Sequence, residues 1–172
     1  MKTDYFAYFG ITRQFFPDLG QLRKLFLKKS RAFHPDFYSL SSEEEKATAQ
    51  KMSGLTNKAF AVLQDFDLRL VHLLELEGQL SGQEQHKLPL EFLLEMMDLN
   101  EALMELQLDE DEPKKLLLLQ QIEKTAKDLL EQTLPFMQTY DRGETLDLAP
   151  IKDYYYKQKY LQRLQQNQER DI

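Results

Sequence analysis

The tripeptide His34-Pro35-Asp36 carries the side chains best suited to chemistry. An imidazole and a carboxylate two residues apart are typical of an acid–base pair or of half a metal site. The sequence completes neither arrangement, because it has no Cys, two other His (His72 and His86), and no evident nucleophile or phosphate-binding loop. An ordinary helix stop stays open as an alternative, since a residue before proline is pushed out of the helical region. We therefore expect no catalytic centre, no metal and no cofactor.

The residues before this tripeptide are predicted to form a helix with two different faces. Apolar side chains share one side of a helical wheel: Leu22, Leu25, Phe26 and Phe33. Basic side chains lie opposite, within an arc of about 60°: Lys24, Lys28 and Arg31. Lys29 lies toward the apolar side, where only its ammonium group reaches water. A cationic face beside a stiff polar loop favours docking to an acidic partner. A merely solvated basic face is the alternative.

The elements that must position these residues all read as helices. Four are expected over the first half: a short one between Asp4 and Gly10, one from Asp18 to about His34, one from Ser42 to about Asp65, and one over 67–77. Residues 37–40 are expected to form a loop. The polar stretch 78–89 holds two Gly and one Pro, and residues 79–89 are predicted to be a linker. Three further helices, near 90–108, 112–140 and 149–168, make a bundle, with a kink or early end at Pro135.

Length and charge limit the classes of function. The 172 residues (20.4 kDa) suffice for one ordinary domain or two small ones. Residues 83–150 hold 6 basic and 16 acidic side chains, a net charge of −10, within a chain of net −7. Such an acidic half argues against nucleic acid and anionic membranes as partners. We find no signal-peptide pattern and no apolar run of about 18 residues, so we expect a cytoplasmic protein.

The first half resembles the J domain of DnaJ-type co-chaperones. The resemblance rests on the basic helix, the tripeptide, and a long helix carrying Asn57-Lys58-Ala59-Phe60 and Leu63. It implies an antiparallel helical hairpin over residues 1–78 that binds a DnaK-type ATPase chaperone and stimulates its ATP hydrolysis. The residues to which the resemblance transfers this role are Lys24, Lys28, Lys29, Arg31, His34, Pro35 and Asp36.

The helix expected near 90–108 carries two apolar stripes. One is typical of core packing: Phe92, Met96, Leu99, Leu103 and Leu106. The second is turned away from it: Leu93, Leu94, Met97 and Met104, edged by Asp98, Glu101 and Glu105. A three-helix bundle needs one stripe per helix, so the second favours an exposed surface for a partner. Packing of the second stripe against the first half or a third helix is the alternative.

The whole layout resembles the HscB (Jac-type) family, in which a J domain precedes a C-terminal three-helix bundle, here 90–172. The resemblance implies an all-α co-chaperone that is not an enzyme. Its bundle would bind the scaffold protein of iron–sulfur cluster assembly (IscU-like), and its J domain would deliver that scaffold to a DnaK-type (HscA-like) chaperone. The implied scaffold contacts are Leu93, Leu94, Met97, Asp98, Glu101, Glu105 and, on the last helix, Tyr160. A general J-domain co-chaperone for unfolded clients, an enzyme using His34 and Asp36, and a structural bundle are the alternatives.

Overall fold

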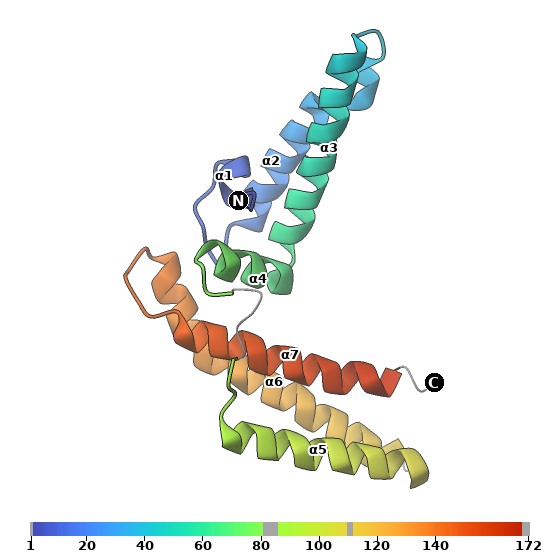
Figure 1. Cartoon of the computed structure of the whole chain (residues 1–172), viewed down its shortest axis with the longest axis vertical. Helices are drawn as coiled ribbons and strands as arrows, with labels where there is room; N and C mark the ends of the chain where they lie inside the picture. Colours follow the sequence, from blue (N-terminus) through green and yellow to red (C-terminus); the bar gives the residue numbers. More distant parts are fainter. Residues whose placement is uncertain (1, 81–85, 110–111, 170–172) are drawn as a thin grey trace. The chain divides into compact units, whose positions relative to one another are not determined.

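A computed structural model describes residues 2–80, 86–109 and 112–169, and every regular element in those ranges is helical (Figure 1). The elements are α1 (Tyr5–Phe9), α2 (Leu19–Ala32), the 3-10 helix η1 (Pro35–Tyr38), α3 (Glu43–Gln64), α4 (Phe66–Leu76), α5 (Leu90–Asp109), α6 (Glu112–Asp141) and α7 (Ala149–Glu169). The all-α prediction is confirmed. The chain forms two compact units: unit 1 is Met1–Leu80 with Tyr140–Gly143, and unit 2 is Ser81–Thr139 with Glu144–Ile172. None of the described helices has the length and apolarity needed to cross a membrane.

Local capping explains where the helices of unit 1 begin. The Asp4 carboxylate accepts a hydrogen bond from Ala7 N (3.1 Å), and Gly10 ends α1 at φ 69°, a left-handed conformation that favours glycine. The Asp18 carboxylate accepts from Gln21 N (2.9 Å) at the start of α2. Ser42 and Glu45 form a reciprocal capping box at the start of α3. These short-range bonds are why the expected helix starts agree with the structure.

The core of unit 1 lies between α2 and α3 and the shorter helices α1 and α4. Helices α2 and α3 run antiparallel, side by side, and the rings of Phe26 and Phe60 stack at 4.1 Å between centroids (Figure 1). The largest fully buried side chains of this unit are Phe6, Phe15, Leu22, Leu63, Leu70, Leu73 and Leu74. This packing holds one face of α2 inside and leaves its other face available to solvent.

Two buried polar residues of α4 contribute to the same core. Arg69 Nε donates to the carbonyl of Phe15 (2.8 Å), and its Nη1 donates to the carbonyls of Leu63 and Asp65. His72 Nε2 accepts a hydrogen bond from Tyr5 N (3.2 Å), and the two rings stack at 4.5 Å. Burial lowers the pKa of His72, and nearby Lys2 lowers it further. The imidazole is therefore held neutral, as an acceptor.

Residues 140–143, which the sequence-based division assigned to 90–172, group with unit 1. The Asp141 carboxylate accepts hydrogen bonds from Phe15 N (2.6 Å) and Phe16 N (2.8 Å), although burial raises its pKa. The Tyr140 hydroxyl donates to Glu77 Oε1 (2.8 Å), and burial raises the pKa of this phenol. Unit 1 is thus closed by residues distant in the sequence, a feature no local pattern reveals.

In unit 2, α5, α6 and α7 share one apolar core. Its buried members are Phe92, Met96, Leu99, Leu103, Ile122, Leu161 and Leu164. The side chain of Leu106 and residues 81–85 of the expected linker lie outside the described residues. Helix α6 continues through Pro135 to Asp141, so the early end predicted as one alternative there is wrong, and the kink stays a prediction. Thr133 and Met137, two residues before and after Pro135, are buried, and their packing offsets the backbone hydrogen bond that proline cannot donate.

Candidate interaction surfaces

One candidate surface of unit 1 is the basic side of α2. The packing of α2 buries Leu22 completely and leaves Lys24, Lys28 and Arg31 exposed. The three cations line an open hollow of about 580 Å³ together with Leu27 and Ala32. With no acidic side chain among these five, the hollow has a positive potential that suits an acidic partner.

Lys29 is placed apart from the other three cations. Its side chain is half-buried, and its ammonium nitrogen lies 4.3 Å from the centroid of the Tyr8 ring. This is the geometry of a cation–π contact, which stabilises the packing of α1 against α2. Lys29 therefore has a structural contact within unit 1 that the helical wheel could not reveal, because Tyr8 is far from it in the sequence.

The tripeptide follows directly after α2. That helix ends at Ala32, two residues earlier than predicted, and η1 replaces the loop expected over part of 37–40. His34 Nδ1 accepts a hydrogen bond from Asp36 N (3.3 Å), and Oδ2 of the Asp36 carboxylate lies 3.5 Å from the same nitrogen. The Asp36 side chain is 85% exposed and the His34 side chain 51% exposed. The imidazole thus fixes the turn, and the carboxylate is available to a partner.

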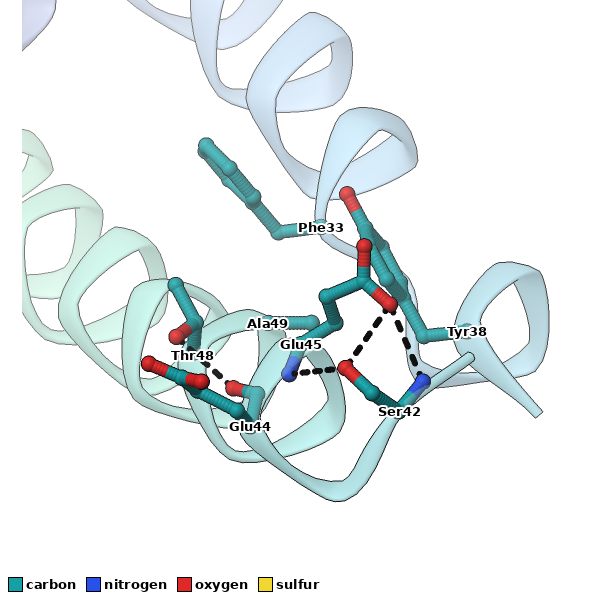
Figure 2. Close-up of a pocket in the computed structure, with 7 residues that line it drawn as sticks. All are labelled: Phe33, Tyr38, Ser42, Glu44, Glu45, Thr48 and Ala49. Atoms are coloured by element: carbon teal, nitrogen blue, oxygen red, sulfur yellow. Dashed lines mark hydrogen bonds between the residues drawn. The ribbon is translucent and has the colours of Figure 1, made fainter. Parts of the chain in front are cut away.

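Figure 2 shows side chains that gather at the end of the α2–α3 hairpin, next to this turn in the sequence. They line a hollow of about 470 Å³ that includes Phe33, Tyr38, Ser42 and Glu45. The Tyr38 hydroxyl donates to the Ala32 carbonyl (2.9 Å), which ties η1 back to the end of α2. Glu45 Oε2 accepts from both the backbone and the hydroxyl of Ser42 (2.9 Å each), and these bonds lower the pKa of Glu45. The tripeptide therefore lies between the end of α2 and the capped start of α3, and hydrogen bonds fix both.

The turn places one imidazole and one carboxylate side by side. Within residues 2–80, 86–109 and 112–169, no group of three or more His, Asp or Glu side chains could hold a metal ion. The Asp36 backbone N–H and the Asp36 carboxylate both lie close to Nδ1 of His34, and both side chains are more than half exposed.

The second candidate surface is the outward side of α5 in unit 2. Leu94 is 51% exposed and Met97 is 61% exposed, whereas the adjacent Met96 is fully buried. Leu93 is half-buried between the two sides, and Met104 continues the exposed row. We call these four residues, Leu93, Leu94, Met97 and Met104, the α5 ridge.

Acidic side chains border the α5 ridge. Asp98, Glu101 and Glu105 are all exposed, so their charges lie beside apolar surface in contact with water. Tyr160 is half-buried instead: it packs against the bundle core, and its ring lies 6.0 Å from that of Phe92 in an edge-on arrangement. The structure therefore brings the carboxylates to the ridge and places Tyr160 at the margin of the core.

Several exposed apolar residues were missed by reasoning from the sequence. Phe37 and Leu40 flank the tripeptide, and Leu27 lies among the cations of α2. Leu116 and Leu117 are exposed on α6. The wheel of α2 contained the signal for Leu27, because this leucine falls outside the apolar stripe.

Comparisons with known proteins agree with this organisation. Residues 88–169 match the family model described as the HSCB C-terminal oligomerisation domain. The mouse iron–sulfur cluster co-chaperone protein HscB is 35% identical over 105 residues, which are 60% of this chain and 45% of the mouse protein. The human protein of the same name is 34% identical over 103 residues, 59% of this chain and 44% of the human one. The matched region thus spans less than half the length of these relatives.

Two solved structures share the fold. The crystal structure of human co-chaperone protein HscB matches with a TM-score of 0.78 at 24% identity, covering 99% of this chain and 82% of that one. The chaperone HscB from Vibrio cholerae matches with a TM-score of 0.71 at 23% identity, covering 98% of this chain and 96% of that one. Both matches extend over the two units, including the helical hairpin of unit 1.

Proposed function

We propose that this chain belongs to the HscB family and is a co-chaperone of iron–sulfur cluster assembly; the match of its C-terminal half to the family model and the shared fold support the proposal. It acts as an adaptor without catalytic activity of its own. Unit 2 binds the scaffold protein on which clusters are built, and unit 1 engages a DnaK-type ATPase chaperone and accelerates its ATP hydrolysis.

One observation supports this proposal above the others: each unit exposes a recognition face, and the two faces carry opposite charge. The cations of α2 lead to an exposed carboxylate at Asp36. The α5 ridge is apolar with a rim of carboxylates. Surfaces of opposite sign suppress binding of the same partner at both faces, because like charges repel. An adaptor that must hold two different proteins needs such a distinction.

The chaperone-binding half of the proposal is tested with Asp36→Asn. This change removes the charge but keeps the size, and the carboxylate is 85% exposed, with a contact of 3.5 Å to the half-exposed imidazole of His34. We expect it to abolish stimulation of the chaperone's ATPase while the circular dichroism spectrum and scaffold binding stay unchanged. Asp67→Asn, at an exposed aspartate of α4, is the matched control and should stimulate normally. Full stimulation by Asp36→Asn would contradict the assignment.

The scaffold-binding half is tested with the double variant Leu94→Ala, Met97→Ala. The matched control removes the same kind of exposed surface elsewhere in unit 2, through Leu116→Ala with Leu117→Ala. We expect the first pair to weaken scaffold binding by about 2–3 kcal/mol, the size of an apolar hot spot, and the second pair to leave it unchanged. Calorimetric titration with the purified scaffold measures both. Equal affinities for the two pairs would reject the α5 ridge as the binding surface, and broad binding to denatured proteins would favour a general co-chaperone.

A further inference from the structure

The cationic face of α2 also exposes an apolar side chain, that of Leu27. Leu27 is 45% exposed, although the side chain lies among Lys24, Lys28 and Arg31. Ala32 lines the same open hollow of about 580 Å³. The inward contacts of the helix come from Leu22, which is fully buried, and from the half-buried Phe26, whereas Leu27 leaves nearly half of its side chain in water.

An exposed leucine beside three cations on the same helix favours a particular kind of ligand. The aliphatic parts of the lysine and arginine side chains add apolar surface beside Leu27, while their charged ends stay in water. A purely acidic ligand would cover the leucine with charged groups and leave its apolar surface unsatisfied. A ligand with an apolar side chain between carboxylates can contact Leu27 and pair with the cations at the same time.

We infer that this hollow receives an aliphatic or aromatic side chain that projects from an acidic segment of the ATPase chaperone. The inference rests on the proposed function and adds the chemistry of the partner's contact segment. Charge complementarity selects the occupant, since the residues lining the hollow carry three positive charges and no negative one. Leu27 is then an apolar anchor, and the cations set the orientation and rate of encounter.

The two contributions differ in their response to salt and to added charge. Burial of the exposed part of Leu27 is insensitive to ionic strength, whereas the attraction of Lys24 and its neighbours is screened. Leu27→Ala should therefore weaken chaperone binding roughly three- to tenfold with an unchanged salt dependence. Leu27→Lys should also weaken binding although it adds a positive charge. Lys24→Ala should reduce the salt dependence itself.

The experiment measures the affinity of the full chain for the purified DnaK-type chaperone, with ATP, at low and high salt. Leu68→Ala is the matched control, because Leu68 is 51% exposed on α4, outside the hollow. Circular dichroism confirms that each variant is folded. Weakening by Leu27→Ala and Leu27→Lys, with Leu68→Ala unchanged, supports the inference.

Three outcomes would overturn it. Tighter binding of Leu27→Lys would mean that the hollow responds to charge alone. Equal affinities of Leu27→Ala and Leu68→Ala for the chaperone would mean that the partner does not cover Leu27. If Leu27→Lys instead altered only self-association of the chain in sedimentation, the occupant would be the apolar α5 ridge of a second copy, with its bordering carboxylates. Failure of the unaltered chain to bind the chaperone is a different result, because it rejects the proposed function itself.

Discussion

Met96 and Met97 are neighbours in α5 but lie in opposite environments, which makes them a matched pair. Met96 is fully buried in the bundle core, and Met97 is 61% exposed on the α5 ridge. Truncating a buried methionine removes its apolar contacts and leaves a cavity, so Met96→Ala should lower the free energy of unfolding by about 3 kcal/mol. Met97→Ala should change it by less than about 0.5 kcal/mol.

Binding of the scaffold should show the reverse order. Full burial of a methionine side chain contributes about 1.5–3 kcal/mol, and about three-fifths of Met97 is still available for burial by a partner. Met97→Ala should therefore cost about 1–2 kcal/mol of binding free energy, or roughly 5- to 30-fold in Kd. Urea unfolding followed by circular dichroism and calorimetric titration with the scaffold measure the two quantities. Equal loss of stability in both variants would refute the orientation of α5.

Three further predictions concern unit 1. Because burial lowers the pKa of His72 below 6.5, the unfolded chain binds the proton more tightly, so the free energy of unfolding should fall as the pH drops below 6.5. Unfolding titrations of His72→Phe should lack that part of the pH dependence, and an unaltered pH profile would contradict the neutral, buried imidazole. Arg69→Lys should lower the free energy of unfolding in urea by about 2–3 kcal/mol, since one ammonium group cannot replace the guanidinium bonds to Phe15, Leu63 and Asp65. A loss below about 0.5 kcal/mol would argue against these bonds. Ser42→Ala should cost about 1 kcal/mol and speed hydrogen exchange in the first turn of α3, and unchanged exchange there would exclude the capping box.

Helix starts were predictable because the bonds that set them are local. The carboxylate of Asp4 and the hydroxyl of Ser42 each accept from an N–H three residues ahead, so the signal lies within one turn of sequence. The 3-10 helix after α2 was not predicted. It depends on the fixed φ of Pro35 together with the bond from Asp36 N to the imidazole of His34, a combination that sequence periodicity does not report.

Contacts between distant residues account for most of what the sequence did not reveal. Lys29 shares a helix with the exposed cations, but its partner Tyr8 belongs to α1. Similarly, Asp141 completes unit 1 through the backbone of Phe15 and Phe16. Arg69 and His72 are buried as well, and each bonds to a residue far away in the sequence, Phe15 and Tyr5 respectively.

The exposure of the two faces was deducible from amphipathic patterns alone. The wheel of α2 separated Leu22 from the cations, and the wheel of α5 separated Met96 from Met97. Which partner covers each face could not be deduced in this way, since a pattern of exposed side chains fixes only the chemistry of the partner. The resemblance to HscB proteins supplied the candidate partners.

The proposal that one chain holds both partners at once is tested most directly by complementation in trans. Asp36→Asn and the double variant Leu94→Ala, Met97→Ala each retain one recognition face. The measurement is the ATPase rate of the chaperone with the scaffold present, comparing the unaltered chain with an equimolar mixture of the two variants. We expect the mixture to lack the extra stimulation that the scaffold gives with the unaltered chain, because neither molecule joins both partners. Stimulation by the mixture equal to that of the unaltered chain would contradict bridging.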